Sequence, residues 1–299
     1  MSDTNAAGQK VSVIGLGAMG AGIARTYVEA GCDVSVWNRS PEKMNALVSL
    51  GATACTSPAD ALRASPHTVV CLAGYATWKQ IIADHGLDEC FKGTCVIQLT
   101  GGDLNEVTEH KAFMDEYGGR LADGAVMCYP RQLGTPDASL LMSGPAEVLE
   151  ECDQLLRILA PTWTNLGDDV TKPVVLSRSL TSGILTSLIG LLNGIAVCRA
   201  AGIPLDVYLE HVDAANAIVP AEKSRLIAAV RDGNTTETEA SINTWAEGHQ
   251  TIHTVSEALG TNLMLQDVVK DVFAQGKDMG LGDHDLAALV EVFTSPREK

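Results

Sequence analysis

The chain has 299 residues, of which 46% are hydrophobic, and a formal net charge of −16 at pH 7. This length is enough for two domains, or one large one, with an ample core. The acidic balance argues against a nucleic-acid partner and against an anionic membrane surface, because both would repel the chain.

The cysteines indicate a reducing, cytoplasmic location. None of the eight forms a C-x-x-C pair, and no group of cysteines and histidines has the spacing of metal ligands, so we expect no metal site. Cys32, Cys71, Cys95 and Cys198 lie in apolar segments, where we expect buried thiols rather than disulfides. Residues 1–10 lack the apolar core of a secretory signal.

An apolar run at residues 11–14 leads directly into a glycine-rich turn, and a helical pattern over residues 21–30 follows it. In dinucleotide-binding units the first glycine of G-x-G-x-x-G permits a tight turn. The second lets the backbone approach a pyrophosphate, and the third allows the helix to pack closely on the strand. The helix then presents free N–H groups and a positive dipole end to the phosphates. The sequence therefore predicts a nucleotide site made by Gly15, Leu16, Gly17, Ala18, Met19 and Gly20.

The segment after the second predicted strand, residues 32–37, selects the cofactor. NAD-binding chains usually place an acidic residue there for the ribose 2′-hydroxyl, whereas this chain has Asn38, Arg39 and Ser40, with Lys43 close behind. Arg39 can grip a 2′-phosphate with its planar fork, Asn38 and Ser40 can donate hydrogen bonds, and Lys43 adds a charge. The segment is also compatible with a polar turn in which Ser40 caps a helix that begins near Pro41. We expect NADPH rather than NADH.

Five further strands are expected at residues 67–72, 94–99, 124–127, 140–144 and 163–167. Helical patterns separate them, which predicts parallel βαβ units and a Rossmann-type sheet. Ligands of such sheets bind beyond the carboxyl ends of the strands. The loops there supply the cofactor candidates Leu72, Ala73, Thr100 and Gly101, and the substrate candidates Met127 and Tyr129.

A long, nearly uncharged stretch at residues 173–201 predicts a helix that is apolar on all sides and must therefore be buried on all sides. A single domain cannot easily surround it, so we expect a second subunit to cover it. A membrane span is disfavoured by its serines and threonines and by the lack of flanking basic residues. Further helices are expected over residues 205–295, with turns near Pro220, residues 233–234 and residues 280–282.

Five segments carry a family resemblance: Gly-Leu-Gly-Ala-Met-Gly at 15–20, Val-Trp-Asn-Arg-Ser at 36–40, Asp-Gly-Ala-Val-Met at 123–127, Leu-Gly-Thr-Pro at 133–136, and Gly-x-Gly-x-x-Asp-x-Ala-Ala-Leu at 280–289. Together they resemble the NADPH-dependent imine reductases, which are relatives of the β-hydroxyacid dehydrogenases. The resemblance covers almost the whole chain.

The resemblance implies an α/β N-terminal Rossmann domain that binds NADPH, over residues 1–170. It also implies a long interdomain helix and an all-α C-terminal domain for substrate binding and dimerisation, over residues 171–299. The implied assembly is a reciprocally swapped homodimer, with each active site between the Rossmann domain of one subunit and the helical domain of the other. The implied reaction is hydride transfer from NADPH to the C=N bond of a small imine or iminium substrate.

One position departs from both families. The β-hydroxyacid dehydrogenases carry an acid/base lysine early on the interdomain helix, and imine reductases usually carry Asp or Tyr there. With Gly183 and Gly190 setting the register, that position is Ser177, and Lys172 lies five residues earlier. A serine hydroxyl cannot act as a general acid near neutral pH. The Ser-Gly-Gly segment that binds hydroxyacids is also replaced, by Cys-Tyr-Pro at 128–130.

Imine reduction can tolerate this loss. A carbonyl becomes an alkoxide that needs a proton or electrostatic support, whereas an iminium ion is already electrophilic and becomes a neutral amine. Our hypothesis is that Ser177 marks a mechanism in which the protein binds, orients and desolvates the substrate, while water or another residue supplies any proton. A β-hydroxyacid dehydrogenase acting on a small hydroxyacid or aldehyde, and a non-catalytic NADPH-binding regulator, remain as alternatives.

Several candidate residues also have a purely structural interpretation. Tyr129 is a candidate catalytic and substrate-binding residue, or an aromatic residue of a turn. The resemblance places Trp245 and His249 in the helical region that faces the nicotinamide, where Trp245 could stack on a flat cationic substrate. The alternatives are core packing for Trp245 and a surface position for His249. Ser177 could simply cap its helix, and Asp123 is expected to accept N–H bonds in a structural role.

Overall fold

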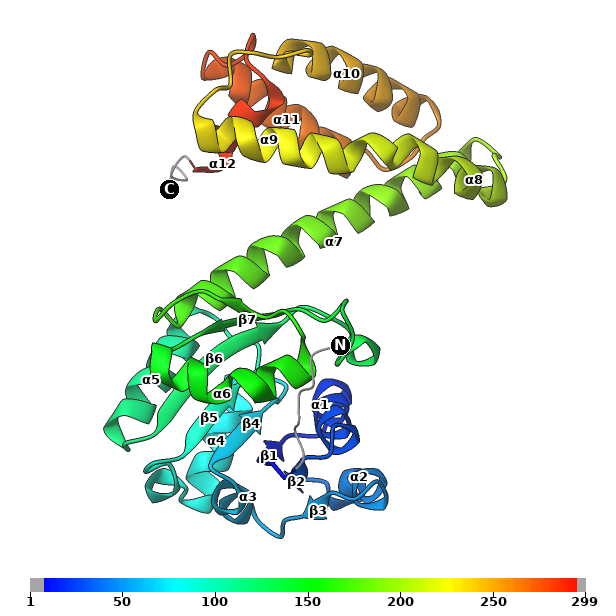
Figure 1. Cartoon of the computed structure of the whole chain (residues 1–299). Helices are drawn as coiled ribbons and strands as arrows, with labels where there is room; N and C mark the ends of the chain where they lie inside the picture. Colours follow the sequence, from blue (N-terminus) through cyan, green and yellow to red (C-terminus); the bar gives the residue numbers. More distant parts are fainter. Residues whose placement is uncertain (1–7, 295–299) are drawn as a thin grey trace. The chain divides into compact units, whose positions relative to one another are not determined.

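The computed structural model describes residues 8–294, which form two compact units (Figure 1). The N-terminal unit extends to Ser182 and the C-terminal unit begins at Gly183. An eight-stranded sheet with helices makes up the first and helices alone make up the second, joined by one long helix. The predicted fold class is confirmed. The expectation of no secretory signal concerns residues 1–10, most of which lie outside the described residues.

The sheet has the strand order β3-β2-β1-β4-β5-β6-β7-β8. Its strands are β1 (Lys10–Ile14), β2 (Asp33–Trp37), β3 (Thr53–Ala54), β4 (His67–Val70), β5 (Cys95–Gln98), β6 (Arg120–Val126), β7 (Leu140–Ser143) and β8 (Thr164–Asn165). Neighbours pair in parallel except β6 and β7, which are antiparallel. The prediction of parallel units throughout is therefore wrong at β7. The connection between β6 and β7 holds only a short 3₁₀ turn, Pro130–Gln132, and no crossover helix.

Helices cover both faces of this sheet. They are α1 (Ala18–Glu29), α2 (Asn45–Ser49), α3 (Pro58–Ala64), α4 (Tyr75–His85), α5 (Leu104–Glu116) and α6 (Ala146–Leu159). Successive strand residues point to opposite faces, so Ile97 packs in the cluster with α1 and α6, and Val96 in the cluster with α3, α4 and α5. A capping box between Asp103 and Glu106 begins α5 and fixes the end of the loop that follows β5.

The expected helix near Pro41 is a short 3₁₀ turn, Pro41–Met44, ahead of α2. Ser40 precedes it in an extended conformation, but its side chain makes no capping hydrogen bond. The cysteines are all free thiols, so the prediction of no disulfides is confirmed. Cys71 and Cys95 are buried as predicted, while Cys32 and Cys198 are only partly buried.

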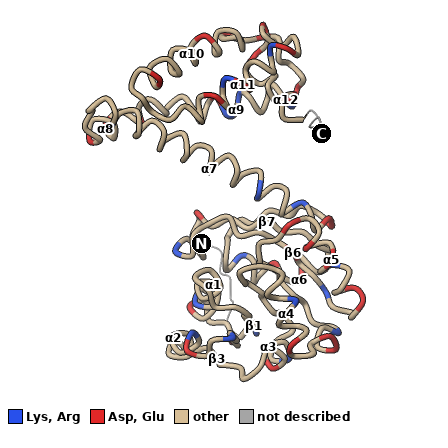
Figure 2. Tube along the Cα trace, turned by 180° about the vertical axis from the view of Figure 1, so that it is seen from behind, with Lys and Arg blue, Asp and Glu red and all other residues tan. Residues whose placement is uncertain are grey.

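The long helix α7 (Thr171–Ala200) matches the apolar stretch predicted at residues 173–201. Its first turns belong to the N-terminal unit, because Val170 and Val174 pack into the core with α4 and α5. The two units consequently divide within α7, beyond the predicted domain boundary at residue 170. Figure 2 shows almost no charged residue along this helix.

The C-terminal unit contains α8 (Leu205–Ala215), α9 (Val219–Asp232), α10 (Ile242–Ala258), α11 (Met264–Asp278) and α12 (Val290–Thr294). The turn expected near Pro220 is present as a short 3₁₀ turn, Asn216–Ile218, directly before α9. Pro220 itself lies in the first turn of α9, a position that tolerates proline. The turns expected at Gly233 and Gly280 are present, and both glycines have a positive φ.

Candidate active site

The geometry of the three turn glycines is what their predicted roles require. Gly15 has φ +95°, and a Cβ there would lie 2.3 Å from the carbonyl oxygen of Cys71. A Cβ on Gly20 would lie 1.9 Å from the carbonyl oxygen of Gly15, so the start of α1 can approach the turn only without a side chain. A Cβ on Gly17 would meet no atom within 4 Å. The backbone at Gly17 is thus left open on the side where a pyrophosphate would approach.

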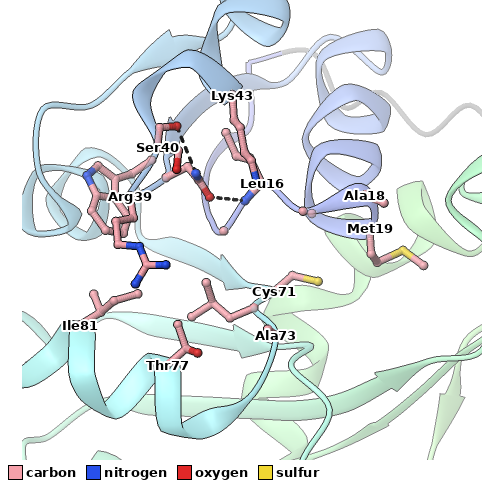
Figure 3. A pocket seen from close by; sticks show the side chains of 16 residues that line it. Leu16, Ala18, Met19, Arg39, Ser40, Lys43, Cys71, Ala73, Thr77 and Ile81 are labelled. Atoms are coloured by element: carbon pink, nitrogen blue, oxygen red, sulfur yellow. Dashed lines mark hydrogen bonds between the residues drawn. The ribbon is translucent and has the colours of Figure 1, made fainter.

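Asn38 holds the glycine turn in place. Its Oδ1 accepts a hydrogen bond of 2.9 Å from the Leu16 amide, and its Nδ2 donates one of 3.1 Å to the Ser40 carbonyl (Figure 3). These bonds tie the turn to the loop after β2. The Asn38 side chain thus fixes the loop that presents Arg39 and Lys43, while its donation to a 2′-phosphate stays a prediction.

A cavity of about 380 Å³, called here the first cavity, lies between this turn, the end of β2 and the start of α4. Arg39 and Lys43 line this cavity and are exposed. These two cations, in a strongly acidic chain, are suited to bind a phosphate group. Twelve of the fourteen predicted cofactor residues line it: Gly15, Leu16, Gly17, Ala18, Met19, Gly20, Asn38, Arg39, Ser40, Lys43, Leu72 and Ala73.

Some residues of the first cavity were not predicted. Trp37 ends β2, and Thr77 and Ile81 lie one turn apart on α4. The helix spacing of Thr77 and Ile81 is the one signal that could have placed them together on one face. Nothing in the sequence says that this face meets the glycine turn.

A second cavity of about 250 Å³ shares Met19, Cys71 and Leu72 with the first. It is lined by the loops after β4 and β5, by the end of β6 and by the first turns of α7. The remaining predicted cofactor residues, Thr100 and Gly101, line this second cavity, as do Met127 and Ser177. The hydroxyl of Thr100 accepts a hydrogen bond of 3.1 Å from the Leu72 amide and so joins the two strand ends.

Arg178 is a cavity residue that was not predicted. Its Nη2 donates a hydrogen bond of 3.1 Å to the Gly102 carbonyl, and a Cβ on Gly101 would lie 2.9 Å from the same nitrogen. Within the second cavity it is the one side chain with a permanent charge. The available signal was its position directly after Ser177 in a stretch almost free of charge.

Ser177 is buried at the wall of the second cavity. Its hydroxyl donates to the Val174 carbonyl of its own helix at 3.1 Å, which leaves only lone pairs for a ligand. Ser177 lies inside α7 rather than at its end, so the interpretation as a helix cap is wrong.

Asp123, the neighbour of the cavity-lining residue Gly124, carries a buried carboxyl group. The Tyr75 hydroxyl donates a hydrogen bond of 2.6 Å to Asp123 Oδ2. Burial raises the pKa of Asp123 to about 7, and the hydrogen bond from Tyr75 opposes the shift. His110, whose ring meets the Tyr75 ring edge-on at 5.5 Å, has its pKa lowered to about 4 by burial. Asp123 thus has the structural role that was expected, although its partner is a hydroxyl group rather than the expected N–H.

Three predicted residues lie elsewhere. Tyr129 lines neither cavity; its side chain is 64% exposed, with the Arg131 guanidinium 4.6 Å from the ring centroid. The sequence placed Tyr129 in the right loop but could not show the direction that its side chain takes.

Trp245 and His249 belong to α10 of the C-terminal unit. Trp245 is 42% exposed, so it is not a core residue of this unit. His249 is buried, with Nε2 at 2.8 Å from Gln266 Oε1, so the interpretation as a surface histidine is wrong. Gln266 in turn donates to Asn193 Oδ1, which ties α10 and α11 to α7.

Two family descriptions match the chain. Residues 10–167 match the NAD binding domain of 6-phosphogluconate dehydrogenase. Residues 179–295 match the C-terminal domain described as NADPH-dependent reductive aminase-like. The chain therefore belongs to the oxidoreductase family that combines a 6-phosphogluconate dehydrogenase-type NAD binding domain with a reductive aminase-like C-terminal domain. The resemblance to the imine reductases, carried by the short motifs, is confirmed.

Relatives of known structure or activity agree. The chain is 26% identical to the NADPH-dependent reductive aminase of Aspergillus oryzae, over 95% of this chain and 96% of that protein. The imine reductase of Myxococcus stipitatus in complex with NADP⁺ has a TM-score of 0.91, with 26% identity over 95% of this chain and all of that one. The Aspergillus terreus reductive aminase, in complex with NADPH and ethyl-5-oxohexanoate, has a TM-score of 0.89, with 26% identity over 96% of this chain and 99% of that one. The predicted cofactor, NADPH, is confirmed.

Proposed function

We propose that this oxidoreductase reduces the C=N bond of an imine or iminium ion to an amine. The observation that carries the proposal is the lining of the second cavity. Apart from Arg178, its ionisable side chain is Cys71, whose pKa burial raises to about 11. Within the described residues the cavity thus holds no lysine, carboxyl or tyrosine that could give a proton to a developing alkoxide.

Bound NADPH supplies a hydride, which needs an electrophilic carbon beside it. The glycine turn, Arg39 and Lys43 would hold the cofactor in the first cavity. The mixed apolar and polar lining of the second cavity would orient the substrate beside the cofactor. An iminium carbon reduced there becomes a neutral amine, so Ser177, whose hydroxyl proton is bound to its own helix, need not donate one.

Arg178 supports a second candidate, reduction of a small carbonyl acid. A guanidinium group can hold a carboxylate with paired hydrogen bonds and can stabilise an alkoxide without giving up a proton. Its bond to the Gly102 carbonyl uses one N–H of the guanidinium group and leaves the others for either role. The position of the acid/base lysine of the β-hydroxyacid dehydrogenases remains Ser177, which disfavours this candidate.

We further propose that the active protein is a swapped homodimer in the cytoplasm. By length and composition α7 could cross a membrane, and none of its most apolar stretch is buried within the chain. The charge-free stretch of α7 exposes apolar side chains such as Leu192, and α8 and α10 expose others, such as Leu209 and Ile252. A second copy would cover this surface and bring Trp245 and His249 of the partner subunit toward the second cavity.

A substrate panel tests the proposed activity. Purified protein is incubated with NADPH and cyclic imines, including aryl-fused N-methyl iminium ions, and separately with NADP⁺ and small hydroxyacids. We expect loss of the reduced-cofactor absorbance with the iminium ions and no turnover of the hydroxyacids. Turnover of hydroxyacids alone would instead support the second candidate. Tight NADPH binding with no turnover in either panel would indicate a regulator.

A further inference from the structure

Three side chains with metal-binding chemistry converge at the end of the sheet away from both cavities. His67 opens β4 and Cys95 opens β5, whereas the cavities lie beyond the last residues of these strands. The register pairs His67 directly with Cys95, and Cys152 on α6 faces them. One ligand atom from each of the three lies within 4.8 Å of the others.

The spacing suits a soft or borderline metal ion. The two sulfur atoms are 3.5 Å apart. Bond lengths of about 2.3 Å place two thiolates on a tetrahedral Zn²⁺ about 3.7 Å apart, so only a small movement is required. Imidazole and thiolate ligands together favour zinc over magnesium or calcium, which prefer oxygen.

Among the described residues, the three side chains make few contacts with polar groups other than one another and Glu151. His67 Nε2 is buried and makes no aligned hydrogen bond, although a Glu151 carboxylate oxygen lies 3.1 Å away. Cys95 and Cys152 are fully buried, with only each other as sulfur partner.

Glu151 and Arg120 lie beside the three candidate ligands and contribute to the charge balance of the site. Glu151 is paired with Arg120 and, through its other oxygen, lies beside His67. Both side chains, and part of the His67 ring, remain accessible to solvent. With two thiolates, Glu151 and Arg120, a bound Zn²⁺ would leave the cluster neutral, which a buried site requires.

We propose that His67, Cys95 and Cys152 form a zinc site, with water as the fourth ligand and Glu151 beside His67. Binding forms two Zn–S bonds, one Zn–N bond and one Zn–O bond, and it releases the two thiol protons to solvent. The ion would join β4, β5 and α6, a structural role independent of the proposed reaction. The expectation of no metal site rested on sequence spacing, and these three residues are far apart in the sequence.

Cobalt titration of the full-length protein tests the site. The protein is reduced, stripped with a chelator and titrated with Co²⁺, whose thiolate charge-transfer and tetrahedral d–d bands report the ligands. We expect one equivalent per chain, displacement by Zn²⁺, and a higher thermal midpoint with Zn²⁺ bound. Cys152→Ser and His67→Gln should each weaken binding by at least about 100-fold, and Glu151→Gln by about tenfold. Cys198→Ser is the matched control, because it replaces a partly buried thiol of the C-terminal unit. This variant should bind Co²⁺ as the parent does.

His67→Gln keeps the test decisive if the buried cysteine variants do not fold, because His67 is partly exposed. A folded parent protein that shows no tetrahedral cobalt spectrum would overturn the proposal. So would an unchanged spectrum in His67→Gln, or a thiol pair that forms a disulfide on oxidation but binds no metal when reduced.

Discussion

The N-terminal and C-terminal units bury their apolar side chains to different extents. In the N-terminal unit two large clusters fill both faces of the sheet, and their strand residues are almost completely buried. Within the described residues, the core cluster of the C-terminal unit has four buried apolar residues, Ile242, Phe273, Ala288 and Leu289. Leu209 and Ile227 are each 68% exposed there.

This difference suggests which unit binds the cofactor alone and which one needs a second copy of the chain. The N-terminal unit closes its own core and builds the first cavity from its own residues, so NADPH binding should need nothing else. In the proposed dimer, the exposed apolar side chains of the C-terminal unit, such as Leu209 and Ile227, would form the interface. Completion of the second cavity should therefore depend on assembly, whereas cofactor binding should not.

The largest expected effect comes from a charge on this surface. Leu192→Glu places a carboxylate on α7 at a side chain that is 63% exposed in the single chain. If a second copy covers this side chain, burial of the unpaired charge should prevent dimerisation. We expect a monomer by light scattering, a loss of C=N turnover of at least about 100-fold, and unchanged NADPH affinity.

Val48→Glu on α2 is the matched control, because it adds the same charge to an exposed apolar position of the N-terminal unit. It should leave assembly and turnover unchanged. An active Leu192→Glu monomer would contradict the expectation that turnover, unlike NADPH binding, depends on dimerisation.

A smaller effect is expected at the first cavity. Arg39→Ala removes the fork that can hold a 2′-phosphate, and charged hydrogen bonds of this kind contribute about 1.5–3 kcal/mol. NADPH affinity should fall by roughly 10- to 100-fold, while NADH affinity should stay within about twofold, as measured by fluorescence titration. An equal loss for both cofactors would show that Arg39 shapes the loop rather than recognising the phosphate.

The cofactor end could be predicted because it depends on local rules. A G-x-G-x-x-G turn and the carboxyl ends of parallel strands are set by short segments, so most residues of the first cavity were found. The role of Asn38 depends on a bond to Leu16, and Arg178 reaches the second cavity only because the first turns of α7 pack on the sheet. The cluster at His67 needs the register of β4 and β5, which no sequence spacing displays.

A third prediction concerns the closed core of the N-terminal unit, which contains the buried Asp123. Its pKa in the folded protein, about 7, is above the ordinary value of 3.8, so the folded state holds the proton more tightly than the unfolded state. The stabilising contribution is complete below about pH 4 and is lost as the pH rises through 7. Asp123→Asn keeps an acceptor for Tyr75 and does not titrate.

Chemical denaturation at pH 5 and pH 8 measures this difference. Between these values the parent should lose on the order of 2–3 kcal/mol relative to Asp123→Asn. His110 titrates in both proteins, so its contribution cancels in the comparison. A constant difference between the two proteins would show that Asp123 is already ionised when buried.

The smallest effect, and the most informative, is expected at Ser177. The most direct measurement is the rate of NADPH oxidation by the parent and by Ser177→Ala with an N-methyl aryl-fused iminium ion, which needs no proton. If the second cavity works by orientation and desolvation alone, the two rates should agree within about threefold. A hundredfold loss in a variant that still binds NADPH would contradict the mechanism, and turnover of hydroxyacids with none of the iminium ion would contradict the proposed reaction.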